Sequence, residues 1–474
     1  MLPELDGDSP KEECGIFGVH APGADVARMT FFGLYALQHR GQESAGIAVA
    51  RQGEVRLRKQ MGLVGQVFSE GDLRHLTGDI AVGHTRYSTT GSTLPENAGP
   101  MAAESDLGTI VVAHNGNTVN ALELRDELVA SGARLQTTTD SELLAHLIAR
   151  TDGITIVEKL RGALDRVTGA YSLAVLTPDQ IVAVRDPHGI RPLCLGRLPD
   201  GWVVASETCA LATVGATYER EIEPGEILVI SAEGLHSASL IEHGERALCV
   251  FELIYFARPD SQLRGERLHL VRQRMGEQLA REHPIEADVV IPIPDSGVPA
   301  AIGYARESGI PYAEGLIKNR YIGRTFIQPD QRLREIGVQL KFNALPEVLA
   351  GKRVVLIDDT IVRGTTSRPI VNMIRAAGAA EVHMRVHAPP VMHPCHLGVD
   401  MASREELIAA NLTIPEIREQ LGVDTLGYLS HDGLFRAIRQ PANEFCSACL
   451  TGSYPVDVDA VIDKHALERT IQRV

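Results

Sequence analysis

The chain has 474 residues, 44% of them hydrophobic and 23% charged, which is usual for globular proteins but too long for one ordinary core. Its net charge of −15 argues against a protein that binds nucleic acid through phosphate contacts. No apolar stretch is long enough to span a bilayer, and residues 1–13 lack the hydrophobic segment of a signal peptide. We therefore expect a cytoplasmic, two-domain protein without a membrane or nucleic-acid partner.

The first half, which we place at residues 14–245, has the pattern of short strands joined by tight turns. Strand candidates include GIFGVHA, SAGIAVA and YSLAVLT. Helical periodicity appears in MTFFGLYALQHR, ALELRDELVAS and SELLAHLIART. Antiparallel strands with few helices predict a layered α+β domain, with sheets packed together and helices outside.

The second half, residues 246–445, changes to an alternation of strands and helices. ADVVIPIPDS leads into VPAAIGYARESG, and RVVLIDD leads through a polar loop into PIVNMIRAAG. Apolar, β-branched runs between helices predict a parallel, doubly wound α/β sheet, in which ligands bind beyond the carboxyl ends of the strands. Residues 446–474 remain as a C-terminal segment.

The strongest local signal is the run VVLIDDTIVRGTTS, in which a buried strand ends in two acids before a polar turn. Asp358 and Asp359 are suited to ribose hydroxyls or a hydrated Mg2+. Gly364 permits close backbone approach, and N–H groups and hydroxyls of the turn can surround a phosphate. The hydroxyl-bearing residues are Thr365, Thr366 and Ser367. The alternative is an ordinary strand–loop–helix turn with capping residues.

This run resembles the phosphoribosyl pyrophosphate loop of type I phosphoribosyltransferases, which implies that Arg363–Ser367 bind the 5-phosphate and that the acids face the ribose. A second segment, Ile317–Lys341, contains six basic residues against two acids. Its Lys318 and Arg324 are candidates to bind the departing pyrophosphate under a closing loop. The alternative for this segment is a solvated basic face.

In the first half, several short motifs follow one another in a fixed order. They are CGIFG from Cys14, QHRGQESAG from Gln38, HTRYST from His84, HNGN from His114 and TDSE from Thr139. Each alone is weak, because a cysteine beside a strand is usually a buried apolar residue. In this order they resemble the class II, N-terminal-nucleophile glutamine amidotransferases over residues 14–240, which implies an αββα sandwich.

The resemblance implies that Cys14 becomes the first residue of the mature chain. In that family the cysteine's own α-amine is the base for its thiol. A peptide amide cannot accept this proton, whereas an α-amine titrates near pH 8. We therefore expect residues 1–13 to be a propeptide, cleaved between Glu13 and Cys14. The alternative is a disordered tail before a structural cysteine.

The family also implies roles for other residues of these motifs. Arg86 would bind the glutamine carboxylate and Asp140 its amino group. Asn115 and the Gly116 N–H would form the oxyanion hole. Thr89 would make a less critical substrate contact.

Four cysteines could form one thiolate site. Cys446 and Cys449 form a CxxC unit, and Cys249 and Cys395 lie far away in sequence. Four thiolates suit zinc or a [4Fe–4S] cluster, and spacing cannot decide between them. Their sequence contexts resemble the propeptide-bearing, iron–sulfur branch of the glutamine phosphoribosylpyrophosphate amidotransferases, which implies the cluster.

Across almost the whole chain the sequence resembles this family of amidophosphoribosyltransferases. The resemblance implies ammonia transfer from glutamine to phosphoribosyl pyrophosphate in purine synthesis, with one Mg2+ and one [4Fe–4S] cluster per subunit. Ser296, Asp358 and Asp359 would hold the Mg2+. Inhibition by purine nucleotides and a homo-oligomer, a dimer or tetramer, are also expected.

Two other classes share part of this pattern. Sugar-phosphate amidotransferases share the first half, but their acceptor domain is a sugar isomerase without a VVLIDDTIVRGTTS run. Purine-responsive regulators keep the phosphoribosyltransferase fold but lack the amidotransferase half and carry a DNA-binding segment. The sequence favours neither class.

Overall fold

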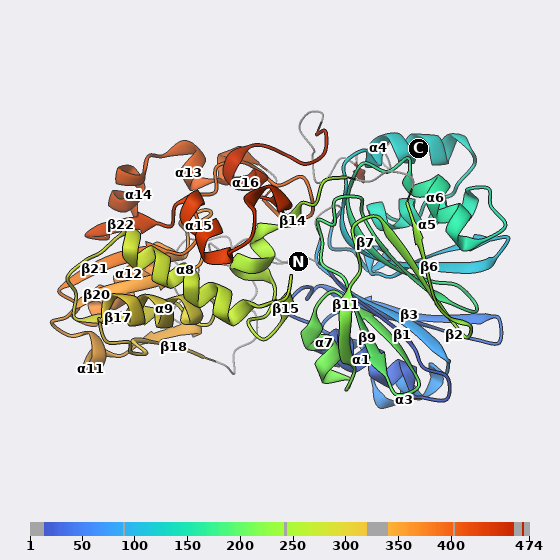
Figure 1. Cartoon of the computed structure of the whole chain (residues 1–474), viewed down its shortest axis with the longest axis horizontal. Coiled ribbons are helices and arrows are strands. Elements are labelled where there is room, and N and C mark those ends of the chain that lie inside the picture. Colours follow the sequence, from blue (N-terminus) through green and yellow to red (C-terminus); the bar gives the residue numbers. More distant parts are fainter. Residues whose placement is uncertain are drawn as a thin grey trace.

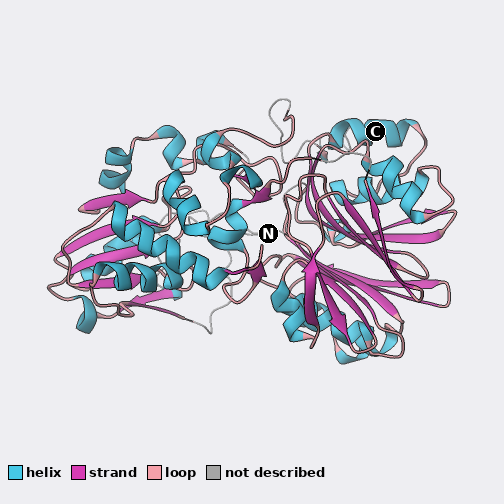
Figure 2. Ribbon diagram, viewed as in Figure 1, coloured by secondary structure: helices cyan, strands magenta, loops and turns pink. Residues whose placement is uncertain are grey.

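The computed structural model has an antiparallel half and a parallel half that lie side by side, with the chain from blue to green forming the first and yellow to red the second (Figures 1 and 2). The described residues are 14–88, 91–240, 244–319, 340–401, 403–458 and 467–468. The expected propeptide, Thr89, Arg324 and most of the basic loop lie outside the described residues.

The antiparallel half contains two stacked sheets. The seven-stranded sheet has the order β11-β9-β10-β1-β4-β2-β3 and the six-stranded sheet β13-β12-β8-β7-β6-β5. The first consists of β1 (Gly15–His20), β2 (Ser44–Arg51), β3 (Glu54–Met61), β4 (Ile80–Arg86), β9 (Cys194–Leu198), β10 (Gly201–Ala205) and β11 (Thr217–Glu221). The second consists of β5 (Met101–Ser105), β6 (Gly108–Thr118), β7 (Gly169–Leu176), β8 (Ile181–Arg185), β12 (Glu226–Ser231) and β13 (Gly234–Ser239).

Helices cover the outer faces of both sheets, so the layers are helix, sheet, sheet and helix. Buried apolar side chains, including Ile16, Val82 and Val111, fill the space between the sheets. The seven-stranded sheet carries α1 (Val26–Ala36), α2 (Val64–Val67), α3 (Glu70–His75) and α7 (Thr208–Thr213). The six-stranded sheet carries α4 (Ala121–Ala130), α5 (Asp140–Arg150) and α6 (Ile156–Leu164). The predicted αββα layering is confirmed.

The parallel half is built on a sheet of order β17-β20-β21-β22 with helices on both faces, as predicted. Its strands are β17 (Val289–Pro292), β20 (Arg353–Asp358), β21 (Glu381–Val386) and β22 (Thr425–Tyr428). One face packs on α8 (Leu268–Glu282), α9 (Val298–Ser308) and α15 (His431–Ile438), and the other on α12 (Ser367–Ala376) and α14 (Ile414–Leu421). A short pair, β18 (Leu316–Lys318) and β19 (Phe342–Ala344), flanks the sheet.

A buried ion network joins the two halves. The Arg40 guanidinium lies between Glu207 of the first half and Glu252, with Nη1–Oε1 and Nη2–Oε1 distances of 2.8 and 2.6 Å. Glu252 begins the π-helical turn η2 (Glu252–Phe256) in the segment that leads into the second half. All three side chains are at most 2% exposed. Because buried charges are tolerated only when they are paired, this network constrains how the halves meet.

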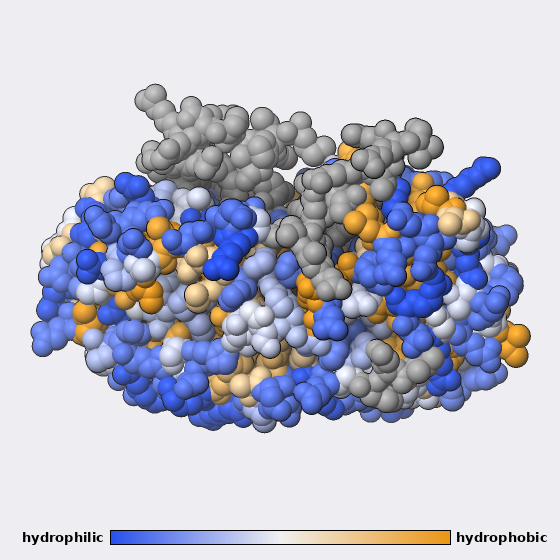
Figure 3. Space-filling model, turned by 90° about the horizontal axis from the view of Figure 1, so that it is seen from above, coloured by the Kyte–Doolittle hydropathy of each residue, from blue (hydrophilic) through white to orange (hydrophobic). Residues whose placement is uncertain are grey.

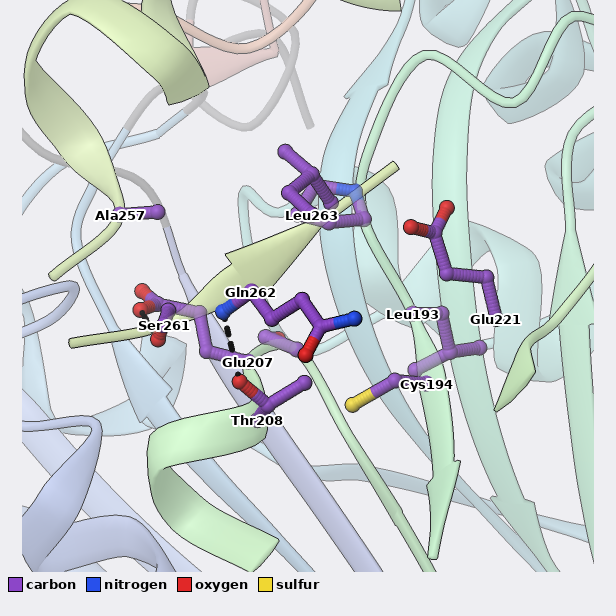
Figure 4. A pocket seen from close by; sticks show the side chains of 11 residues that line it. Leu193, Cys194, Glu207, Thr208, Glu221, Ala257, Ser261, Gln262 and Leu263 are labelled. Carbon is purple, nitrogen blue, oxygen red and sulfur yellow. Dashed lines mark hydrogen bonds between the residues drawn. The ribbon is translucent and has the colours of Figure 1, made fainter. Parts of the chain in front are cut away.

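Figure 4 shows a second contact at this junction. Here β15 (Gln262–Leu263), in the second half of the chain, lies over the start of α7. The Gln262 N–H donates to Thr208 Oγ1 at 2.8 Å, and Ser261 Oγ donates to Glu207 Oε2 at 2.7 Å. The carboxylate that binds Arg40 therefore also binds the second half.

Hydrophilic residues predominate on the face of the molecule seen in Figure 3, with hydrophobic residues in small groups between them. Within the described part of the chain, every helix is too short or too polar to cross a bilayer.

The ion network makes a prediction about stability. We expect Arg40→Met to lower the free energy of unfolding in urea by about 3–5 kcal/mol, because two buried carboxylates lose their shared cation. The control is Arg28→Met, which removes pairs with Asp25 and Glu70 on the exposed side of α1 and should change unfolding little. Equally small effects of both substitutions would contradict the assigned role of Arg40.

Candidate active sites

Cys14 directly precedes β1 and lies beside the end of β4. The two strands are antiparallel, with Gly15 opposite Thr85, so Cys14 lies close to Arg86 and Tyr87. Its Sγ lies 3.5 Å from the Tyr87 carbonyl oxygen, and the residue is 9% exposed. Burial raises the pKa of the Cys14 thiol to about 11, although Arg86 acts to lower it. As part of an uncleaved chain, this thiol is protonated at neutral pH.

Two charged residues of opposite sign, Arg86 and Asp140, lie near enough to the thiol to act on its pKa. Arg86, at the end of β4, lies 3.5 Å from Glu43. Asp140, the first residue of α5, accepts a hydrogen bond from the Thr118 N–H at 3.0 Å. Burial acts to raise the pKa of Asp140, but His114, the Thr118 N–H and Arg86 hold it below its ordinary value. A fixed cation and a fixed carboxylate near one nucleophile suit a free amino acid as ligand.

The C-terminal part of β6 carries Asn115 and Gly116. The Asn115 side chain is 1% exposed, and neither amide atom has a hydrogen-bond partner among the described residues. Burying an amide in this way is costly, so the group is available to a ligand. Gly116 has φ +152°, and a Cβ there would lie 1.9 Å from the Ala170 carbonyl oxygen, so only glycine fits.

In the second half, the two predicted acids lie at the carboxyl end of β20. Asp358 and Asp359 are 6% and 0% exposed. The Asp359 N–H donates to Asp358 Oδ1 at 3.0 Å, and Thr360 Oγ1 donates to Asp359 Oδ2 at 2.6 Å. Asp359 Oδ1 has no partner within the described part of the chain, so an acceptor is left for a hydroxyl or a cation.

The neighbouring parallel strand brings Ser296 to the same edge of the sheet. Pro292 of β17 is opposite Ile357 of β20, so the turn that contains Ser296 and the loop after Asp358 emerge side by side. Lys318 Nζ lies 2.5 Å from Asp295 Oδ2, which places this lysine beside that turn. The sheet thus brings together residues that lie about 60 positions apart in the sequence.

The predicted phosphate turn leads from β20 into α12. Gly364 has φ +73°, and a Cβ there would lie 2.8 Å from Ile408 Cδ1, which explains the glycine. Thr366 is the residue before α12, and Ser367 is its first residue. Arg363 pairs with Glu406. The turn therefore has the predicted position at a helix N-terminus, where the helix dipole favours an anion.

The four predicted thiolate ligands line one cavity. Cys249 of β14 (Leu248–Cys249) is opposite Cys446 of the parallel strand β23 (Phe445–Cys446), and Cys449 lies in α16 (Ala448–Thr451). Cys395 and its neighbour Leu397 complete this wall. Burial, and then the proximity of Cys249, raise the pKa of Cys446 to about 12.

These cysteines line the cavity from segments that are far apart in the sequence. Among the described residues, no three His, Cys, Asp or Glu side chains are arranged to hold a single metal ion. Four thiolates can bind one zinc ion or the irons of a [4Fe–4S] cluster. Ligation of either kind would have to displace the protons of the thiols.

The residues that hold the Cys14 backbone in place were not predicted from the sequence. The motif QHRGQESAG contains Arg40 and Glu43, but no role for either was inferred. The Arg40 Nε donates to the Cys14 carbonyl oxygen at 3.3 Å. Its partners Glu207 and Glu252 are 167 and 212 residues away, so no local pattern could reveal them.

Comparison with known families agrees with this division of the chain. The model of the glutamine amidotransferase domain matches residues 84–213, and that of the phosphoribosyl transferase domain matches residues 266–390. The first match contains Arg86, Asn115 and Asp140, and the second contains Ser296 and Asp358.

Full-length relatives are also found. The amidophosphoribosyltransferase of Synechocystis sp. is 55% identical over 96% of this chain and 93% of its own, and that of Bacillus subtilis is 47% identical over 97% of both. This chain is also similar to the solved structure of the B. subtilis glutamine phosphoribosylpyrophosphate amidotransferase, complexed with ADP and GMP. The two structures superpose with a TM-score of 0.89 at 46% sequence identity, over 95% of this chain and 100% of the other. The chain therefore belongs to the amidophosphoribosyltransferase family.

Proposed function

We propose that the chain hydrolyses glutamine at Cys14 and transfers the ammonia to C1 of 5-phosphoribosyl 1-pyrophosphate beside Asp358 and Asp359. The products are 5-phosphoribosylamine, glutamate and pyrophosphate, in the first committed step of purine synthesis. The observation that carries this proposal is the union of two sites in one chain. One is a buried thiol flanked by Arg86 and Asp140, and the other is a strand-end acid pair followed by a phosphate turn.

Residues 1–13 act as a propeptide whose removal activates Cys14. The raised pKa of its buried thiol requires a base, and the freed α-amine supplies one on the same residue. The amine takes the thiol proton as sulfur attacks the glutamine side-chain carbonyl. Arg86 and Asp140 orient the substrate through its carboxylate and amino group, and Thr89 makes a further contact.

The tetrahedral intermediate places negative charge on the former carbonyl oxygen. The Asn115 Nδ2 and the Gly116 N–H stabilise this charge, and the buried, unpartnered state of the amide among the described residues supports the role. Collapse of the intermediate breaks the C–N bond and releases ammonia, which takes its proton from the α-ammonium group. Water then hydrolyses the thioester to glutamate.

Ammonia must reach the second site unprotonated, which requires a passage that excludes water. The turn η2 carries buried apolar side chains beside Glu252, including Leu253 and Ile254, between the two halves. These apolar side chains would form part of the wall of such a passage. Closure of Ile317–Lys341 over the substrate would complete the passage.

At the second site, Arg363, Gly364, Thr365, Thr366 and Ser367 bind the 5-phosphate. Asp358 and Asp359 hold the ribose, and Lys318 and Arg324 bind the pyrophosphate. Bound Mg2+, one per subunit and held by Ser296 with the two acids, would neutralise charge on the leaving pyrophosphate. The unpartnered Asp359 Oδ1, within the described part of the chain, fits this role. Ammonia attacks C1 with inversion.

The four cysteines hold one [4Fe–4S] cluster per subunit. Cys249, Cys395, Cys446 and Cys449 supply four thiolates around one cavity, which fits the donor set of such a cluster. When bound, the cluster supplies a structural crosslink between the segment after the first half, the loop at Cys395 and the C-terminal segment.

Regulation and assembly follow from the family. The B. subtilis structure contains ADP and GMP, and we expect purine nucleotides to inhibit this enzyme as well. We also expect a cytoplasmic homo-oligomer, either a dimer or a tetramer.

The test of function is the stoichiometry of the two half-reactions. With glutamine, phosphoribosyl pyrophosphate and Mg2+, glutamate and pyrophosphate should be released in equal amounts. Asn115→Ala should lower glutamine-dependent turnover about 10²- to 10³-fold, because one oxyanion donor is lost, and should leave ammonia-dependent pyrophosphate release intact. Glutamate release without pyrophosphate would contradict the proposal.

The thiolate site makes a separate prediction. Anaerobically purified protein should contain about four irons and four sulfides per chain, with a brown colour. Cys446→Ser should lose this iron, whereas Cys194→Ser, at a buried cysteine outside the cavity, should retain it. One zinc and no iron in the active protein would exclude the cluster.

A further inference from the structure

The loop that carries Cys395 lies directly against the central strand of the glutamine site. Asn117 Nδ2 donates to the His396 carbonyl oxygen at 2.9 Å. A Cβ on Gly398 would lie 3.1 Å from the Gly116 carbonyl carbon, so the two backbones approach closely. The Leu397 N–H in turn donates to Cys395 Sγ at 3.4 Å. Cys395 of the thiolate site and the Asn115–Gly116 pair are therefore linked through the short segment His396–Gly398, by hydrogen bonds and close backbone approach.

Arg191 makes a second connection between the same sites. Its guanidinium is fully buried, and Nε donates to the Leu397 carbonyl oxygen at 3.0 Å. Its own carbonyl oxygen accepts from Ser172 Oγ at 3.1 Å, and Ser172 is the cross-strand partner of Asn115. The neighbouring Ile190 carbonyl oxygen accepts from the Cys249 N–H at 3.0 Å. Arg191 thus lies between two cysteine-bearing segments and the strands β6 and β7, which carry Asn115 and its partner Ser172.

We propose that Asn117 and Arg191 are positioning residues through which the occupied cysteine site holds β6 in the geometry needed for the oxyanion hole. The inference rests on the proposed function of both sites. Metal ligands that are fixed by their metal make the Cys395 loop rigid, and groups just outside the ligands transmit that constraint. Small displacements of the oxyanion-hole donors should slow catalysis, because these donors stabilise the transition state only when they are held at hydrogen-bond distance from the developing oxyanion.

Asn117 gives a sharper test than Arg191, because its replacement breaks the hydrogen bond to the His396 carbonyl oxygen without removing a buried charge. In cluster-loaded protein, we expect Asn117→Ala to lower kcat for glutamine about 10- to 100-fold with little change in KM. Iron content and ammonia-dependent turnover should stay at wild-type values. The control is Asn120→Ala, which removes an equally long bond, 2.9 Å, from Nδ2 to the Arg166 carbonyl oxygen, together with the bond that its Oδ1 accepts from the Thr168 N–H at 3.0 Å, both within the first half. The control should keep wild-type kcat.

Hydrogen–deuterium exchange over residues 108–118 supplies a readout independent of turnover. Exchange should rise when iron is removed from the wild type, and Asn117→Ala should show the raised exchange even when loaded. Unchanged kcat in Asn117→Ala, or exchange that does not respond to iron, would overturn the proposal. Wild-type protein that never binds iron would instead refute the proposed cofactor, and the inference would fall with it. The two failures are therefore distinguishable.

Discussion

The buried Arg40 guanidinium constrains both the junction of the two halves and the backbone of the nucleophile. Arg40 is buried between Glu207 and Glu252, and its Nε also donates to the Cys14 carbonyl oxygen. Burial acts to lower the pKa of Arg40, but the two carboxylates raise it above its ordinary value, so it remains charged. Because such a group is stable only with all its partners in place, the backbone of Cys14 and the junction between the halves are constrained together.

The two halves build their sites by different means. In the first, side chains from the paired strands and from α5 enter a buried region, which suits attack on a small amide. In the second, loops from adjacent parallel strands meet at the carboxyl edge, which suits an extended, highly charged substrate. Such an edge leaves backbone N–H groups available to phosphate, whereas the thiol of the first site is buried.

Local patterns predicted most of this fold, because strand and helix periods and strand-end acids are local features. The helix expected over 29–40 instead spans Val26–Ala36, since Asp25 caps it and the chain turns at Leu37. That turn is what buries Arg40 in the ion network. Its partners, like the contacts of Asn117 and Arg191 with the Cys395 loop, lie far away in sequence. Cysteine spacing could not decide between zinc and an iron–sulfur cluster. It also could not show that the four cysteines line one cavity, because their segments are brought together only by the fold.

Glutamine hydrolysis by the proposed mechanism requires the α-amine of Cys14 to act as the base for its own thiol. The decisive measurement is the intact mass and N-terminal sequence of fully active protein, alongside Cys14→Ser. We expect the active chain to begin at Cys14, lighter by 13 residues, and the serine variant to lose glutamine use but keep ammonia use. Full activity in chains that begin at Met1, with undiminished glutamine use by the serine variant, would contradict the mechanism.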